Sequence, residues 1–288
     1  MFARHSGQAR HITPQFGMTR LLGCFAVLAA CVSCTQDAPI TPGPVVTSAA
    51  SGPATIEPDS PPPATSVDSD QSDMEIDRSN QVLRHAVFFS FTEESSEEDV
   101  AGVAAAFAAL PSKIEEIIDF QWGVNNSPEG LDDGFTHCFL LTFKDKAGRA
   151  VYLPHAAHKA FGDVLRPYMK DVFVIDYWGT PQESALESEL KHAVFLNFKD
   201  DATPEDVAAV DEGLAELPEK IDAIKAFEWG RNNSPEKHDD GFTHCAMVTF
   251  ADEAGRDEYL PHPDHKAFVE ILMPVLEQVR VLDFAPAK

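Results

Sequence analysis

The sequence is poor in basic residues and has no apolar run of membrane-spanning length. Its 288 residues include 22 Lys and Arg against 47 Asp and Glu, which gives a formal net charge of −25 at pH 7. Nucleic-acid binding requires clustered basic side chains, so the composition argues against a nucleic-acid partner. An acidic surface also resists self-association and anionic lipid surfaces, and a well-solvated exterior is the simplest interpretation.

Motifs for cofactors are missing as well. The chain contains no glycine-rich nucleotide loop, no metal-ligand cluster and no nucleophile with triad-like neighbours. The paired acidic residues at 132–133 and 239–240 lack the alternating acids and closing glutamate of a calcium loop. They are typical of turns that end at a glycine. We therefore expect no cofactor and no metal.

The N-terminus predicts export. Residues 21–30 form a short apolar run after Arg20, which predicts a signal peptide over residues 1–30 rather than a membrane-spanning helix. The sequence Leu-Ala-Ala-Cys at 28–31 resembles a bacterial lipobox. This resemblance implies cleavage before Cys31 and acylation of its thiol and new amine, and several acyl chains anchor a protein firmly. An ordinary secreted protein with a cysteine near the cut is the alternative.

Residues 31–82 have the composition of a tether. They are rich in Pro, Ser, Thr and Asp and contain almost no large apolar side chains, so they cannot bury enough surface to offset their ordering entropy. We expect a disordered segment that spans roughly 40 Å as a flexible coil. The folded part would then hang from a membrane of the cell envelope, facing the periplasm or the exterior.

The rest of the chain contains one folded unit twice, at 84–178 and 190–284. Residues 85–177 align without a gap on residues 192–284, an offset of 107 positions, and about 50 of the 93 aligned pairs are identical. A period this long indicates two whole domains, because the repeats of solenoids are shorter.

The longest identical segments are polar rather than core-like. They read Asn-Asn-Ser-Pro-Glu, Asp-Asp-Gly-Phe-Thr-His-Cys, and Tyr-Leu-Pro-His followed by His-Lys-Ala-Phe, and they lie at 125–129 and 232–236, at 132–138 and 239–245, and at 152–161 and 259–268. Cys138 and Cys245 occupy one position in the two units and predict two buried free thiols. A disulfide between them would require their strands to meet.

Each unit predicts the order β-α-β-β-α-β. In the first unit the strands are expected near 85–91, 117–123, 135–143 and 171–177, and the second unit repeats them. This order is a ferredoxin-like split arrangement, an α+β fold with helices on one face of a four-stranded antiparallel sheet. Strands one and three are apolar on both sides, so the other face must be covered. The sister unit is the obvious cover, which predicts an intrachain barrel with a central cavity and a monomeric protein.

Two helical details complete this prediction. Thr203 followed by Pro204 and acidic residues is typical of a helix N-terminus, and apolar residues then recur at helical spacing. Pro111 and Pro218 should end or kink the first helix of each unit, and Pro154 should break the second.

Both units carry His-Ala-Val-Phe, Trp-Gly-x-Asn-Asn-Ser-Pro-Glu, Gly-Phe-Thr-His and Tyr-Leu-Pro-His-x-x-His in this order. With these motifs residues 84–178 and 190–284 resemble stress-responsive A/B barrel domains. In that family two domains pair through their sheets into a dimeric α+β barrel, which implies that the pair forms within this one chain. Relatives include plant heat-stable stress proteins and a plant polyketide cyclase, and the wider superfamily includes cofactor-free monooxygenases.

Histidines on strands supply the first candidate site residues. Alternation places His85 on one strand face with neighbouring apolar residues, and His137 on one face of the third strand. If both faces line the barrel, the two imidazoles lie among aromatic rings inside the cavity and contact a ligand. His192 and His244 occupy the same positions in the second unit.

A second set lies on a helical stretch. Tyr152, His155 and His158 are spaced three apart and fall on one side of it, where they would close the cavity mouth. The second unit repeats them as Tyr259, His262 and His265. His155 and His262 have two interpretations, a helix cap or a ligand contact. The pair of imidazoles at i and i+3 lacks the carboxylate or thiolate that would complete a metal site.

The resemblance implies a catalytic role for two pairs. A neutral imidazole suits proton abstraction next to a carbonyl, and a tyrosine hydroxyl can orient a substrate or stabilise an enolate. In the plant cyclase a tyrosine and the histidine six residues later act in this way, which corresponds here to Tyr152 with His158 and Tyr259 with His265. If only one half retains chemistry, the second is favoured because it is stiffened by a proline at position 263.

Two functions therefore stand side by side. The first is a non-enzymatic, membrane-tethered module that binds a small apolar or aromatic molecule or protects against stress. The second is a cofactor-free cyclase, isomerase or monooxygenase that acts on an aromatic or polyketide-like substrate through a Tyr/His pair. A lipid tether and the absence of a pathway partner in the chain favour binding.

Overall fold

The structure, a computed structural model, describes residues 78–181 and 188–287. The predicted signal peptide, Cys31 and nearly all of the predicted tether lie outside these residues. The first repeat contains β1 (Val82–Phe91), α1 (Glu97–Ala108), β2 (Ile117–Val124), β3 (His137–Phe143), α2 (Lys146–Tyr152), α3 (Ala156–Leu165) and β4 (Met169–Gly179). The second contains β5 (Leu190–Phe198), α4 (Pro204–Lys220), β6 (Ala226–Arg231), β7 (His244–Phe250), α5 (Glu253–Tyr259), α6 (Pro263–Leu272) and β8 (Leu276–Phe284).

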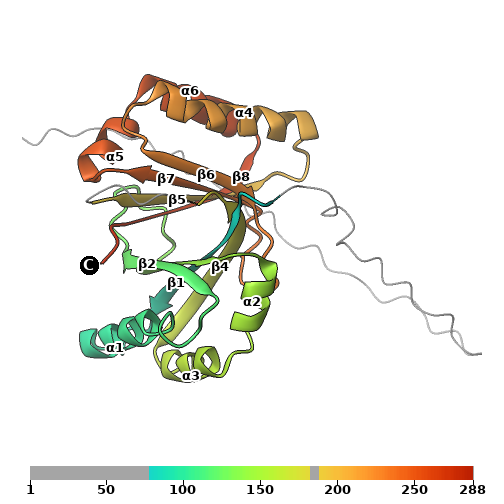
Figure 1. Cartoon of the computed structure of the whole chain (residues 1–288). Coiled ribbons are helices and arrows are strands. Elements are labelled where there is room, and N and C mark those ends of the chain that lie inside the picture. Colours follow the sequence, from blue (N-terminus) through green and yellow to red (C-terminus); the bar gives the residue numbers. More distant parts are fainter. Residues whose placement is uncertain (1–77, 182–187, 288) are drawn as a thin grey trace, which may run out of the picture. The chain divides into compact units, whose positions relative to one another are not determined.

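Each repeat forms one four-stranded antiparallel sheet. The strand orders are β2-β3-β1-β4 and β6-β7-β5-β8, so the central strands of each sheet are the first and third strands of its repeat. Helices cover one face of each sheet (Figure 1). The predicted α+β class and the ferredoxin-like order are confirmed.

Reciprocal capping fixes where the first helix of each repeat begins. The Ser96 hydroxyl accepts a hydrogen bond from the main-chain nitrogen of Asp99 at 3.2 Å, and the Asp99 carboxylate accepts one from the Ser96 nitrogen at 3.0 Å. Thr203 and Asp206 make the same exchange before α4, where Pro204 takes the first helical position. These contacts satisfy main-chain donors that have no partner inside the helix.

The prolines act differently in the two repeats. α1 ends before Pro111, and Pro154 separates α2 from α3, as the sequence predicts. α4 instead continues through Pro218 to its end two residues later. A proline so close to a C-terminus disturbs only the last turn, so the longer helix persists.

The two faces of β1 pack against different layers. Val87 belongs to a cluster that includes Phe107 of α1, whereas Phe88 belongs to a cluster that includes Phe195 of β5. His85 points to the same side as Val87 and contacts the ring of Tyr152 in α2. The expectation that this face lines the space between the sheets is therefore wrong, because alternation defines two faces but not the layer that covers each.

The space between the two sheets is a packed core shared by both repeats. Its largest side chains are aromatic: Phe88, Phe135, Phe173, Tyr177, Phe195, Phe242 and Phe284. Cys138 and Cys245 are buried in the same cluster as free thiols, as predicted. A hollow of about 640 Å³ remains in this layer beside the ion pair of Arg84 with Glu228, whose charged atoms lie 2.8 Å apart. Aromatic side chains therefore fill much of the expected central cavity, and this hollow is what remains of it.

Glycines let the edges of the two sheets meet. β2 lies beside β8 and β4 beside β6, which closes the sheets into a barrel. A Cβ at Gly123 would lie 2.5 Å from the main-chain oxygen of Ala285, and one at Gly230 would lie 3.0 Å from Cβ of Tyr177. Larger residues would push these edges apart, so glycine is required by close approach at both places.

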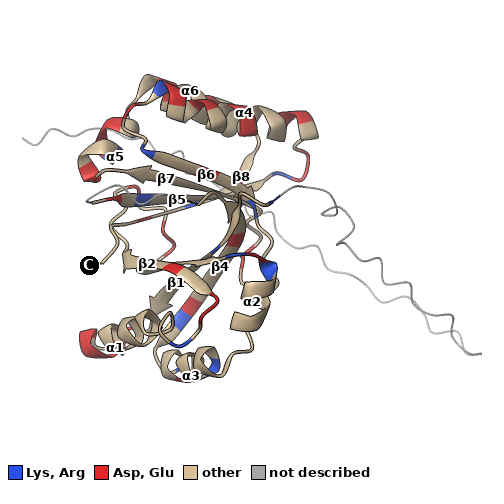
Figure 2. Cartoon of the chain, viewed as in Figure 1, with Lys and Arg blue, Asp and Glu red and all other residues tan. Residues whose placement is uncertain are grey.

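Acidic side chains gather on the helices, on the outer sides of the two sheets (Figure 2). They include the acidic residues in the first turns of α1 and α4, where a negative charge interacts favourably with the helix dipole. Within residues 78–181 and 188–287, no helix has the length and apolar character needed to cross a membrane.

Candidate functional site

A cavity of about 560 Å³ lies in the first repeat between its sheet and its helices. Its apolar lining is Val87, Phe89, Phe107, Tyr152, Leu153, Phe161, Leu165, Met169, Val172 and Val174. Its polar lining includes His85, His158, Lys159, Asp163, Arg166, Glu236 and His238. The volume and the mostly apolar wall with a few polar groups are typical of small-molecule sites.

Tyr152 and His158 meet at this cavity, whereas the sequence placed them at the mouth of a cavity between the two sheets. Their ring centroids lie 4.3 Å apart, and Tyr152 is fully buried. Its hydroxyl has no hydrogen-bond partner among the described residues. His158 Nδ1 donates to the main-chain oxygen of Leu153 at 3.0 Å, so Nε2 is the atom that accepts a proton. Burial lowers the pKa of His158, which favours the neutral ring.

His85 joins the same group from β1. Its ring lies 5.5 Å from that of Tyr152, and its Nδ1 donates to Oδ1 of Asp176 at 2.6 Å. Arg149 of α2 binds the other oxygen of Asp176 at 2.5 Å. Burial opposes the charge on His85, but the neighbouring Asp176 carboxylate outweighs it and raises the pKa of His85. Burial also opposes the charge on Asp176, but the neighbouring His85 and Arg149 outweigh it and lower the pKa of Asp176.

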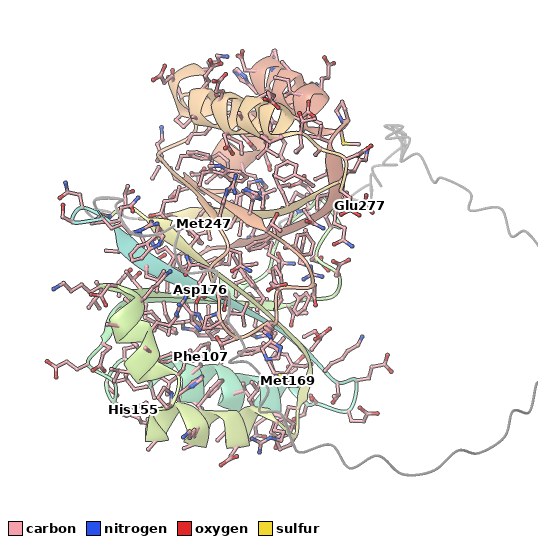
Figure 3. The ribbon with its side chains drawn as sticks, turned by 90° about the vertical axis from the view of Figure 1, so that its right-hand side faces the viewer. Phe107, His155, Met169, Asp176, Met247 and Glu277 are labelled. Atoms are coloured by element: carbon pink, nitrogen blue, oxygen red, sulfur yellow. The ribbon has the colours of Figure 1, made fainter. Side chains whose placement is uncertain are left out.

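The second repeat completes this arrangement through its Asn-Asn-Ser-Pro-Glu loop. The Asn232 side chain accepts a hydrogen bond from the main-chain nitrogen of Asp176 at 3.1 Å. Asn233 accepts two from Arg149 Nη1, at 2.9 Å on its side chain and 3.1 Å on its main chain. Oε1 of Glu236 lies 3.8 Å from Nε2 of His85. The first repeat's site is thus built by both repeats, and Figure 3 shows Asp176 near the middle of the described fold.

His137 and His244 lie elsewhere. Each stands at the start of the third strand of its repeat, with Nδ1 within hydrogen-bond distance of a neighbouring threonine hydroxyl, at 2.9 Å and 2.8 Å. His244 stacks on Trp229 with ring centroids 5.2 Å apart. Neither histidine lines the cavity of the first repeat.

His155 and His262 are helix caps. Nδ1 of His155 accepts a hydrogen bond from the main-chain nitrogen of Ala157 at 3.1 Å, and His262 accepts one from Asp264 at 3.3 Å. Figure 3 shows His155 at the start of α3, apart from Asp176. Of the two interpretations of these residues, the contacts favour capping.

The second repeat reproduces the same constellation. Tyr259 and His265 have ring centroids 4.1 Å apart, and His265 Nδ1 bonds the main-chain oxygen of Leu260 at 3.1 Å. His192 donates to Asp283 at 2.7 Å. The proline at position 263 favoured the second repeat, but the cavity beside a Tyr/His pair lies in the first.

Five residues of this site were not predicted from the sequence: Arg149, Asp176, Asn232, Asn233 and Glu236. All five are identical in the other repeat, so the repeat alignment contained the signal. Identity at a duplicated position did not reveal which residues meet across the repeats. Across the described part of the chain, no group of three or more His, Cys, Asp or Glu side chains could hold a metal.

The fold and this site define a tandem pair of ferredoxin-like α+β domains with a buried Tyr/His cavity. The Stress responsive A/B Barrel Domain matches residues 83–179 and 190–286, and the chain belongs to this family. The resemblance seen in the sequence is confirmed on this point.

Known relatives match one repeat. The stress-response A/B barrel domain-containing protein HS1 of Arabidopsis thaliana is 36% identical over 97 residues, which is 34% of this chain and 89% of the relative. Olivetolic acid cyclase of Cannabis sativa is 28% identical over 99 residues, 34% of this chain and 98% of the relative. A provisionally assigned monooxygenase of Fusobacterium nucleatum has a TM-score of 0.51 at 9% identity, over 73% of this chain and 94% of its own, and it shows the fold alone.

Proposed function

We propose that this protein is a membrane-tethered binding module and that its first repeat holds a small, largely apolar molecule. The cavity of about 560 Å³ carries this proposal. Its wall offers aromatic rings for packing and the unpartnered hydroxyl of Tyr152 for orientation. A buried hydroxyl without a partner costs free energy, and a ligand that bonds to it recovers that cost.

The neutral fluorescent probe N-phenyl-1-naphthylamine tests this function. Val174 lies on β4 in the cavity wall and is buried, so Val174→Phe should fill the cavity and weaken binding about tenfold or more. Val281→Phe makes the same change at the same position of the second repeat and serves as the matched control. Equal binding by the wild-type protein and Val174→Phe, with both folded by circular dichroism, would contradict the proposal.

Proton-transfer catalysis is the second candidate function, and the orientation of His158 favours it. A neutral imidazole with Nε2 available lies beside a tyrosine hydroxyl, which is the arrangement for abstracting a proton next to a carbonyl. The likeness to olivetolic acid cyclase supports a cyclase, and an isomerase or a monooxygenase would use the same proton transfer. The second repeat offers Tyr259 with His265 for the same chemistry.

Hydrogen–deuterium exchange at the central carbon of ethyl acetoacetate, followed by proton NMR, tests this chemistry. Removing a positioned base typically lowers the rate by about 10²–10⁴. We expect that loss in His158→Ala, with His265→Ala reporting on the second repeat. If the wild-type protein catalyses no exchange and His158→Ala only lowers the melting temperature, the binding module stands as the function.

The membrane tether belongs to the same proposal. Its support is the apolar run at 21–30, the lipobox-like segment that ends at Cys31 and the composition of residues 31–82. Nearly all of these residues lie outside the described part of the chain, and the last of them, Val82, begins β1. The tether would hold the binding module at the surface of a membrane in the cell envelope.

A further inference from the structure

The Asn-Asn-Ser-Pro-Glu loop of the second repeat ends inside the cavity of the first. Glu236 and His238 are the second-repeat residues in the cavity wall. The main-chain oxygen of His238 accepts a hydrogen bond from the nitrogen of Val174 at 2.8 Å, which fixes this loop to β4. Glu236 is therefore held at the cavity by backbone contacts.

The Glu236 carboxylate lines the same cavity as the polar groups of His85, Tyr152 and His158. Its Oε1 lies 3.8 Å from Nε2 of His85, which is too long for a hydrogen bond. Neither this buried oxygen nor the Tyr152 hydroxyl has a partner among the described residues. The negative charge of Glu236 also acts on His85, Tyr152 and His158, and in each case favours the protonated form. Polar groups from both repeats thus converge without satisfying one another.

The charged side chains around the cavity differ in their exposure and in whether they have an oppositely charged partner. Asp176 is paired with both His85 and Arg149. The cations Lys159 of α3 and Arg166, which follows α3, also line the cavity, but both are exposed, and Arg166 is paired with Asp163 at 2.8 Å. Solvent screens these exposed groups strongly. Oε1 of Glu236 has no hydrogen-bond partner among the described residues and is the buried acceptor that a ligand meets.

Resting on the proposed binding function, we infer that Glu236 sets the ligand specificity of the first repeat's cavity. Its carboxylate accepts a hydrogen bond from a hydroxyl or amino group of a neutral aromatic ligand and disfavours a ligand that carries a carboxylate. A donor on the ligand satisfies the buried oxygen, whereas a second anion adds repulsion in a poorly solvated space. The repeated Asn-Asn-Ser-Pro-Glu loop thereby has a functional role, because the loop of each repeat reaches the site of the other repeat.

Two probes of nearly equal size test this inference, the neutral 2-naphthol and the anionic 2-naphthoate. Their affinities are measured by isothermal titration calorimetry on the full chain near neutral pH. The wild-type protein should bind 2-naphthol about tenfold or more tightly than 2-naphthoate. Glu236→Gln keeps the size and one acceptor but removes the charge, and it should reduce this ratio to about twofold. The corresponding Glu129→Gln should leave the ratio at the first-repeat cavity unchanged.

The filling variant separates this inference from the proposed function. Any binding that is lost in Val174→Phe is assigned to the first-repeat cavity. If Val174→Phe does not fold, Val87→Phe is used as the filling variant, because Val87 also lines this cavity. If Val174→Phe removes binding but Glu236→Gln keeps the wild-type ratio, the role of Glu236 is wrong and the binding function stands. If both probes bind equally well with the cavity filled, both conclusions are overturned.

Discussion

His85 donates a hydrogen bond of 2.6 Å to Asp176, and this contact joins the candidate site to the interface between the repeats. Asp176 is fully buried and also receives Arg149, while its main chain is bonded to the loop that carries Asn232 and Asn233. One carboxylate therefore neutralises a buried guanidinium and orients a cavity histidine. Stability and site geometry depend on the same residue.

Asp176→Asn should lower the free energy of unfolding by about 3 kcal/mol, because it leaves the buried Arg149 without an anionic partner. Urea denaturation measures this loss. Asp163→Asn removes an exposed ion pair with Arg166 and should change stability by less than about 1 kcal/mol. Equal effects of the two variants would show that the buried pair does not stabilise the fold.

Stability should fall at acidic pH through His244. Burial lowers the pKa of this imidazole from 6.5 to about 4. The unfolded chain binds a proton near pH 6.5 while the folded chain resists it, so this contribution is complete above pH 6.5 and is lost as pH falls toward 4. The loss is on the order of 3 kcal/mol, because one pKa unit corresponds to about 1.4 kcal/mol.

His244→Phe keeps an aromatic ring against Trp229 but removes the titrating group. Unfolding free energies of the variant and of the wild-type protein are compared in urea from about pH 7 to pH 4, and the difference isolates His244 from other titrating groups. The variant should lose less stability on acidification. Parallel curves would contradict the prediction.

Substitution of the glycines at the barrel seam should be costly. A Cβ at Gly123 would lie 2.5 Å from the main-chain oxygen of Ala285, so Gly123→Ala should destabilise the protein by about 1–3 kcal/mol. Gly102 in α1 has no atom within 4 Å of its Cβ position, and Gly102→Ala should stabilise by up to about 1 kcal/mol. Guanidinium denaturation compares the two, and opposite signs are expected.

Cys31→Ser should release the protein from membranes, because it removes the residue that would carry the lipid. Fractionation of cells that express the full chain measures the distribution between membrane and soluble fractions. Cys24→Ser is the control, because that cysteine lies within the predicted signal peptide. Unchanged membrane association of Cys31→Ser would exclude lipidation at this position.

The protein should be monomeric once it is free of lipid. The sheet face opposite the helices is covered by the other repeat, through contacts such as Phe88 with Phe195, whose ring centroids lie 5.1 Å apart. Light scattering on the full-length Cys31→Ser protein measures its mass. A stable dimer would indicate that the repeats pair between chains.

Much of this architecture follows from the sequence. The offset of 107 residues predicts two equal domains, and strand and helix patterns predict their order. Tyr152 and His158 are close in the chain and meet in the structure, although Tyr152 ends α2 and His158 lies in α3. Helix lengths were less predictable, as α4 shows by continuing through Pro218.

The sequence by itself determined the two domains, the order of helices and strands along the chain and the local Tyr/His pairs, because these follow from the internal repeat and from patterns among near neighbours in the chain. Only the tertiary structure decided that His85 faces the helices, since alternation treats the two faces of a strand alike. It also decided that Glu236 reaches His85 across the repeats. That meeting depends on how two sheets pack and close into a barrel, and no local pattern in the chain encodes which loop then reaches which strand.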